Sequence, residues 1–252
     1  MPRLPTCFRD LASEAAALAR AAASYLIGVE DPHDEDLIEI VPCGADAAPA
    51  HCFATPVFLV HGFAHNWSAF LPLLGRLERA GFRRFVRFNY DSVGDAPEEM
   101  AGALARRVHE VIARTGAPRV HLVGHSLGGV VVRVQVGMLG GDAHLGHAVA
   151  IAAPLRGTPW GRLPLLPRAL RELAPRAELL ELLEGLEDDR SRWTTIAGDR
   201  DLLVPPRRAH LEGARQITVR GLGHVGLLYA ERVFEEVVAA LVGGEKSAPP
   251  PA

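Results

Sequence analysis

Short apolar segments and longer segments of helical periodicity alternate along most of this chain. The apolar segments predict strands at residues 37–41, 57–60, 85–88, 120–123, 149–152, 193–197 and 216–219. Helical spacing of apolar residues predicts helices at 67–79, 98–114, 127–139 and 229–241. Because strands that alternate with helices form a mainly parallel sheet covered on both faces, we expect an α/β fold.

The first 35 residues precede this alternation and predict one amphipathic helix. Its apolar residues recur at helical spacing, at Leu11, Ala15, Leu18, Ala22, Tyr25 and Leu26. We expect this face to pack on the body of the protein, and a helix lying on a membrane surface is the alternative. Charged residues such as Asp10 and Arg20 interrupt the segment, which excludes a long apolar signal sequence and a membrane span. We therefore expect a cytoplasmic protein, with peripheral membrane contact as the alternative.

Length and composition predict one main domain. The chain has 252 residues, of which 48% are hydrophobic, which suffices for one substantial core. We place the domain at residues 36–243 and expect the Pro/Ala-rich tail, 244–252, to be disordered. The net charge of −3 comes from 27 basic and 30 acidic residues that are interspersed, so there is no basic stripe for nucleic acid.

Three cysteines, Cys7, Cys43 and Cys52, have no spacing typical of a metal site. An odd number cannot form a complete disulfide framework. Cys43 and Cys52 could pair across a short loop, but we favour buried or free thiols.

The sequence Gly-His-Ser-Leu-Gly at residues 124–128 lies between a predicted strand and a predicted helix. A serine at such a sharp turn has strained dihedral angles, so the residues two positions away on either side must be almost free of side chain. Gly124 and Gly128 meet this requirement. The turn, known as a nucleophile elbow, would lift the Ser126 hydroxyl above the sheet, next to the N–H groups of a helix N-terminus.

A serine nucleophile needs a base, and the base needs an acid that orients it. We expect Asp201 to be the acid, because it lies deep in the loop after the strand at 193–197, and we assign Asp199 to a helix cap or a surface ion pair. We expect His224 to be the base, because it follows the last strand in a glycine-rich loop and the order Ser, Asp, His suits an elbow. His210 is the alternative base.

Negative charge that develops on the substrate needs hydrogen-bond donors. The strand at 57–60 enters the turn His61-Gly62-Phe63, so the backbone N–H of Phe63 could point into the site beside that of Leu127. We interpret His61 and His125 as structural residues that bond or pack beneath the neighbouring loops rather than as bases.

Together these motifs resemble bacterial triacylglycerol lipases and related esterases of the α/β-hydrolase fold. The resemblance covers about residues 55–240 and rests on the motifs HGF at 61–63, NW at 66–67, FNYD at 88–91, GHSLGG at 124–129, AP at 153–154, RGT at 156–158 and the segment 201–205. It implies Ser126, Asp201 and His224 as the triad and Phe63 and Leu127 as oxyanion donors. Residues 152–155 read Ala-Ala-Pro-Leu where such lipases usually have Gly-Thr-Pro-His, so we carry over no metal site and expect no cofactor.

Residues 154–192 are rich in Leu and Pro and predict a small cap. Apolar residues at helical spacing follow one another at Leu179, Leu182, Leu183 and Leu186. They would either form an acyl-chain pocket or pack permanently on the sheet. We expect a serine ester hydrolase that cleaves small lipophilic acyl esters or lipids. The cap or the N-terminal helix could contact a lipid surface. An acyltransferase or thioesterase on the same fold, and a non-catalytic binding protein, are the alternatives.

Overall fold

The computed structural model describes residues 6–29, 38–40 and 52–246. Within these ranges a seven-stranded sheet has the order β1-β3-β2-β4-β5-β6-β7. The strands are β1 Ile38–Ile40, β2 Val57–Val60, β3 Arg84–Phe88, β4 Val120–His125, β5 Leu145–Ile151, β6 Trp193–Gly198 and β7 Arg215–Val219. Strand β1 pairs antiparallel with β3, and the other neighbours pair in parallel. The predicted α/β architecture is confirmed.

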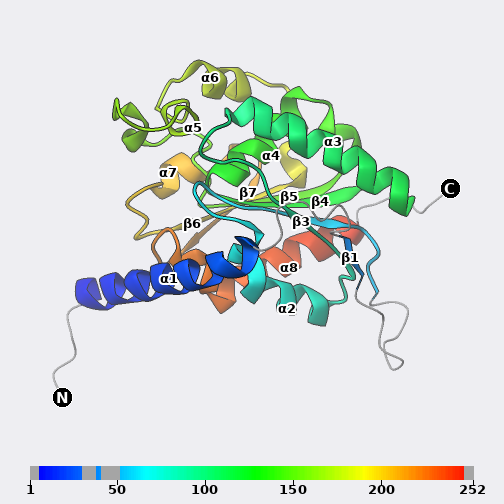
Figure 1. Cartoon of the computed structure of the whole chain (residues 1–252), viewed down its shortest axis with the longest axis horizontal. Helices are drawn as coiled ribbons and strands as arrows, with labels where there is room; N and C mark the ends of the chain where they lie inside the picture. The colour runs from blue at the N-terminus through cyan, green and yellow to red at the C-terminus, as the bar shows by residue number, and fades with distance from the viewer. Residues whose placement is uncertain (1–5, 30–37, 41–51, 247–252) are drawn as a thin grey trace.

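Helices cover both faces of this sheet (Figure 1). The longer ones are α1 Thr6–Val29, α2 Leu71–Ala80, α3 Pro97–Thr115, α4 Leu127–Met138 and α8 Glu231–Lys246. Shorter α-helices are α5 Arg168–Arg171, α6 Glu178–Glu184 and α7 Pro206–Ala209. The 3-10 helices include η2 Trp67–Phe70, η3 Gly141–His144, η4 Pro159–Arg162, η5 Arg190–Arg192 and η6 Gly226–Tyr229. The helix predicted at 67–79 is thus divided into η2 and α2.

The alternation of side chains along the strands builds two cores. In β2, Phe58 and Val60 pack into the core under α3 and α4, while Val57 and Leu59 pack into the core under α2 and α8. All four residues are fully buried, as expected of a parallel sheet covered on both faces. The carboxyl ends of the parallel strands therefore meet at one edge, where ligand-facing loops gather.

The C-terminal helix extends beyond the boundary that we predicted for the tail. Helix α8 continues to Lys246, so residues 244–246 are helical rather than disordered. Gly244 is buried, and a Cβ there would lie 2.8 Å from the Cβ of His147. The absence of a side chain thus lets the end of the helix approach the sheet closely. Residues 247–252 lie outside the described part of the chain.

Helix α1 packs on the body through a different face from the one predicted. Among its described side chains, Ala17 and Ala21 are buried, whereas Leu18 and Tyr25 are 53% and 40% exposed. The side chains of Leu11 and Leu26 are not described. The helix contacts η2 and η6, and small alanine side chains allow this close approach. None of the helices in the described ranges has the length and apolar character needed to cross a membrane.

The prediction of buried or free thiols is wrong for Cys52, which is disulfide-bonded. Spacing along the sequence does not reveal whether two sulfur atoms approach each other in the fold. Cys43 and the side chain of Cys7 lie outside what the structure describes.

Helix α6 packs on α4 and buries one face. Leu179, Leu180 and Leu183 belong to the core on the α3 and α4 side of the sheet, while Leu182 is 53% exposed. The segment is fixed further by buried Arg133 of α4, whose guanidinium binds the carboxylate of Asp188. The packed-helix alternative therefore describes α6.

We expect Leu183→Ala to lower the free energy of unfolding by about 2–5 kcal/mol, because it leaves a cavity in a close-packed core. Leu182→Ala on the same helix should change it by less than about 0.5 kcal/mol, since that side chain lies at the surface. Urea unfolding of both variants measures the difference. Equal losses would contradict the packing described for α6.

Candidate active site

Ser126 occupies a sharp turn between β4 and α4, with φ 53° and ψ −123°. This strained conformation depends on close backbone packing around it. A Cβ at Gly124 would lie 2.6 Å from the carbonyl oxygen of Gly128, and one at Gly128 would lie 2.2 Å from the carbonyl oxygen of Val60. The two glycines let α4 begin directly against β2 and β4, so the Ser126 side chain stands at the carboxyl edge of the sheet.

Ser126, His224 and Asp201 form one hydrogen-bonded chain. The Ser126 hydroxyl lies 3.0 Å from His224 Nε2, and His224 Nδ1 lies 2.7 Å from Asp201 Oδ2. Because a carboxylate only accepts, Nδ1–H is the donor and Nε2 is free to accept from the serine. Asp201 and His224 are buried, with 3% and 8% of their surfaces exposed. The imidazole is thus held in the orientation and tautomer that can remove the serine proton.

The loop after β6 orients Asp201 through its own backbone. Oδ1 of Asp201 accepts the N–H groups of Leu203, at 2.9 Å, and Val204, at 2.8 Å. These donors satisfy Oδ1 in a buried position and leave Oδ2 for the histidine. Sequence reasoning placed Asp201 in this loop, and the structure brings it to His224.

The two alternatives considered for acid and base lie elsewhere. Asp199 is exposed, and its Oδ1 accepts the Gly221 N–H at 2.6 Å. His210 follows α7, and its ring nitrogens lie 2.9 Å from the hydroxyls of Thr195 and Thr218, on neighbouring strands. It therefore links β6 to β7.

Two further histidines support the loops of the site. His61 donates from Nδ1 to the Gly62 carbonyl at 2.8 Å, and its ring stacks on Tyr90. His125 lies 3.3 Å through Nε2 from the carbonyl oxygen of His224. Burial lowers the pKa of His61 to about 4 and holds the pKa of His125 well below its ordinary value. Both rings are therefore neutral near pH 7 and poor bases.

The turn after β2 faces Ser126. A Cβ at Gly62 would lie 3.1 Å from the Cβ of Ser126, so the backbone that leads into Phe63 passes close to the serine. Ala64 has a positive φ of 50°, and its N–H donates to Ser92 Oγ at 2.9 Å. Leu127 is the first residue of α4, where backbone N–H groups lack partners within the helix. Phe63 and Leu127 thus border the serine from two elements.

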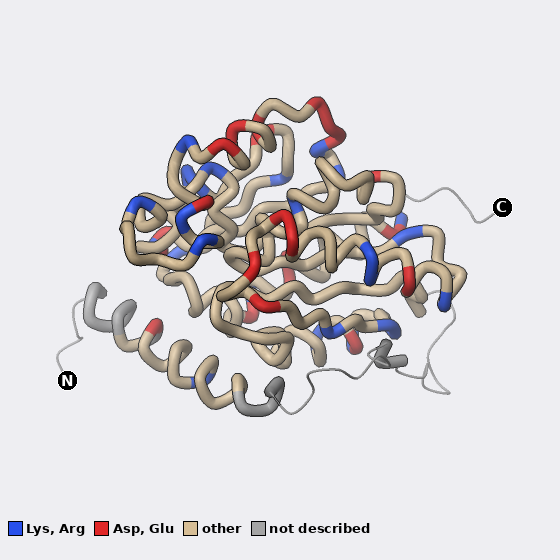
Figure 2. Tube along the Cα trace, turned by 45° about the horizontal axis from the view of Figure 1, so that its top comes forward, with Lys and Arg blue, Asp and Glu red and all other residues tan. Residues whose placement is uncertain are grey.

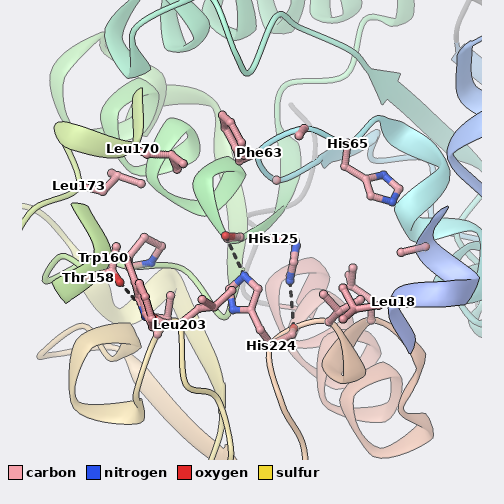
Figure 3. A pocket seen from close by; sticks show the side chains of 18 of the residues that line it. Leu18, Phe63, His65, His125, Thr158, Trp160, Leu170, Leu173, Leu203 and His224 are labelled. Carbon is pink, nitrogen blue, oxygen red and sulfur yellow. Dashed lines mark hydrogen bonds between the residues drawn. The ribbon is translucent and has the colours of Figure 1, made fainter. Parts of the chain in front are cut away.

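A mainly apolar pocket of about 590 Å³ opens above Ser126 and His224. Figure 3 shows apolar side chains arranged around the two histidines His125 and His224. The pocket is lined by Leu18, Ala21, Ala22, Tyr25, Gly62, Phe63, Ala64, His65, His125, Ser126, Pro154, Thr158, Trp160, Leu170, Leu173, Leu203, Val204, His224, Val225 and Leu228. Such a cavity has the size and character of a small-molecule site.

The walls of this pocket differ from those expected. Leu182 and Leu183 do not line it, because α6 faces α4. The cap contributes instead through residues such as Trp160 and Leu170, and Trp160 Nε1 donates to the Leu202 carbonyl at 3.1 Å. Helix α1 supplies a further wall that sequence reasoning missed. The sequence showed the apolar spacing of α1, but it did not show that these residues would line the pocket.

The residues that the structure describes contain no group of three or more His, Cys, Asp or Glu that could hold a metal ion. Chemically, the site combines a hydroxyl, an imidazole, an orienting carboxylate and the N-terminus of a helix beside a mainly apolar cavity. These groups together can carry out nucleophilic attack on a carbonyl carbon.

Comparisons with known proteins agree with this architecture. The mature lipase BlEst2 of Bacillus licheniformis superposes with a TM-score of 0.63 at 15% identity, over 78% of this chain and 96% of that one. Aspergillus fumigatus lipase B gives 0.64 at 18% identity, over 84% and 58%. A predicted carbamate hydrolase, RutD, of Variovorax paradoxus is 34% identical over 80 residues, which span 30% of each chain. A family model matches residues 57–195, more than half of the chain, which therefore belongs to the alpha/beta hydrolase family.

Proposed function

We propose that this protein is a serine hydrolase that cleaves esters of lipophilic acyl groups through an acyl-enzyme. The observation that carries the proposal is the hydrogen-bonded chain from Asp201 through His224 to Ser126, at the floor of an apolar pocket. In this proposal Ser126 is the nucleophile, His224 the general base and acid, and Asp201 the group that orients His224.

In the first half-reaction the Ser126 oxygen attacks the ester carbonyl carbon while His224 Nε2 takes the hydroxyl proton. The carbonyl oxygen becomes an oxyanion, which we assign to the backbone N–H groups of Phe63 and Leu127. The start of α4 adds the positive end of a helix dipole at this position. Collapse of the intermediate breaks the bond to the alcohol, and His224 gives its proton to the departing oxygen.

In the second half-reaction water replaces the alcohol. His224 removes a proton from the water, whose oxygen attacks the acyl carbon, and the proton then returns to the Ser126 oxygen as the acid leaves. His61 and His125 take no part in these transfers, because their low pKa values make them weak bases.

The pocket favours an apolar acyl group over a small polar substrate. Leu18, Phe63 and Leu170 give it apolar walls from three segments of the chain. The side-chain donors of Thr158 and Trp160 are bonded to backbone carbonyls. A carbamate, the substrate class in the name of one relative, is small and polar, and its recognition would require polar partners. An acyl chain gains instead about 0.8 kcal/mol for each methylene that it buries.

Transfer of the acyl group to an alcohol or from a thioester would use the same acyl-enzyme. Product analysis with and without added glycerol distinguishes transfer from hydrolysis. An enzyme that transfers the acyl group would form a glyceride in place of part of the free acid. A binding protein without catalysis would give no product burst at all.

We expect Ser126→Ala to abolish covalent labelling by a fluorophosphonate probe and the burst of p-nitrophenol from p-nitrophenyl octanoate. The side chain stands at a turn rather than in the core, so the melting temperature should change little. Intact-mass spectrometry of the labelled wild type and variant makes the measurement. Labelling of the variant at another serine, or no labelling of the wild type, would refute the assignment of the nucleophile.

The two aspartates of the β6 loop should differ sharply. Asp201→Asn should lower kcat by about four orders of magnitude, because the amide favours the wrong histidine tautomer. Asp199→Asn, which changes only an exposed loop contact, should lower kcat by less than about tenfold, the effect of roughly one neutral hydrogen bond. Steady-state kinetics on one ester compares them. A larger loss for Asp199→Asn would reverse the assignment.

Two leucines with the same exposure, 53%, provide a matched test of the pocket. Leu18 lines it and Leu182 does not. Leu18→Asp should reduce kcat/KM for octanoate relative to acetate by about tenfold or more, since two lost methylene contacts suffice for that ratio.

Leu182→Asp serves as the control and should leave the octanoate-to-acetate ratio unchanged. Equal octanoate-to-acetate ratios of kcat/KM in both variants would mean that the acyl chain does not bind beside Leu18.

A further inference from the structure

Helix α1 reaches the loop that carries His224 through a single carboxylate. Glu14 Oε1 accepts the Val225 N–H at 2.7 Å, and Oε2 accepts the Gly226 N–H at 3.0 Å. These two peptide groups follow His224 directly in the chain. More than 200 residues separate Glu14 from them, so only the fold brings them together.

The histidine loop is shaped to receive this carboxylate. A Cβ built on Gly223 would lie 2.4 Å from Glu14 Oε2, and its three nearest atoms all belong to the Glu14 carboxylate. A Cβ on Gly226 would lie 2.9 Å from the same oxygen. Glycines on both sides of His224 thus leave room for Glu14, although the backbone of neither is in the left-handed region that would require glycine for itself.

The contact lies beside the proposed chemistry and not at a remote end of the helix. Residues 18, 21, 22 and 25 of α1 line the pocket above Ser126. The carbonyl oxygen of Tyr25 accepts a hydrogen bond from Asn66 Nδ2 at 2.8 Å, in the segment that follows the turn at Phe63. Helix α1 therefore spans the space between the loop of the proposed base and the loop of a proposed oxyanion donor. Figure 2 shows the described part of α1 lying along the body of the protein.

We propose that Glu14 is a positioning residue that fixes the His224 loop, so that Nε2 stays within reach of the Ser126 hydroxyl. This inference rests on the proposed function. Two hydrogen bonds to a carboxylate are stronger than neutral ones, and they hold the two peptide groups next to His224 from outside the loop. Asp201 holds the ring itself, and His125 contacts the His224 carbonyl. The two bonds from Glu14 add a restraint on the peptide groups that follow the ring.

The alternative is that Glu14 merely attaches α1 to the body. Arg20 provides the matched control, because it lies on the same helix and approaches η6 as well, 5.8 Å from the ring of Tyr229. Its loss would loosen α1 without removing a bond to the peptide groups beside His224.

The experiment measures kcat, KM and melting temperature for Glu14→Ala, Glu14→Gln and Arg20→Gln in the full chain. Glu14→Ala should lower kcat on p-nitrophenyl butyrate by about tenfold with little change in KM, as loss of charge-assisted hydrogen bonds predicts. The kcat of Glu14→Gln should lie between those of the wild type and Glu14→Ala, because the amide oxygen can still accept one N–H. Arg20→Gln should retain the wild-type kcat. An equal loss in Arg20→Gln, or none in Glu14→Ala, would overturn the proposal.

A double-mutant cycle tests the steric fit. Gly223→Ala should lower kcat by about tenfold in the wild type, because its Cβ displaces the carboxylate, and should have little further effect in Glu14→Ala. Equal losses from Gly223→Ala in both backgrounds would show that the glycine serves another purpose and would overturn the proposed coupling.

A readout without catalysis separates this inference from the proposed function. The proton on His224 Nδ1, bonded to Asp201, should give a downfield resonance in the proton NMR spectrum. It should shift or broaden in Glu14→Ala and remain in Arg20→Gln. If the wild type cleaves no ester, the proposed function fails and the resonance still tests Glu14. An unaltered resonance in Glu14→Ala would overturn the positioning role.

Discussion

The strained backbone of Ser126 is the constraint on which the rest of the site depends. Such a conformation costs about 1–3 kcal/mol and persists only where the surrounding structure determines it. Here the Ser126 N–H donates to the Ile151 carbonyl of β5 at 2.9 Å, and α4 begins in contact with β2. A Cβ at Gly129 would lie 2.4 Å from the Cβ of Ala153. The turn is therefore fixed by three strands and one helix together, and any added bulk would move α4 away from the sheet.

The buried polar groups around this turn are stabilised in two different ways. The buried carboxylate of Asp201 is compensated by two backbone N–H groups and one imidazole N–H. His61 and His125 are instead held neutral, because burial disfavours their charged forms. Neighbouring imidazoles thus differ in their surroundings and in their hydrogen-bond partners. Of the three, His224 alone is bonded both to an aspartate and to the serine in the described structure.

Helix α1 lies outside the segment that the family model matches, residues 57–195, yet it forms part of the pocket. His224 and the loop that Glu14 contacts also lie beyond that segment. The elbow and the turn at Phe63 are within it. The matched segment therefore holds the elbow and the turn at Phe63, whereas His224 and α1 lie outside it and meet through Glu14.

The sequence by itself determined the strand and helix alternation, the elbow at Ser126 and the order of Ser126, Asp201 and His224. These follow from local rules: side-chain periodicity, glycine at a crowded turn and the position of loops at strand ends. The tertiary structure decided which face of α1 is buried, that α6 packs on α4, that Cys52 is bridged and that Glu14 meets the His224 loop. Those outcomes depend on contacts between residues distant in the chain. In α1, the small residues Ala17 and Ala21 are buried, whereas Leu18 and Tyr25 stay partly exposed beside the pocket. The reason is that close approach of the helix to the body, and not hydrophobicity alone, decides which face is buried.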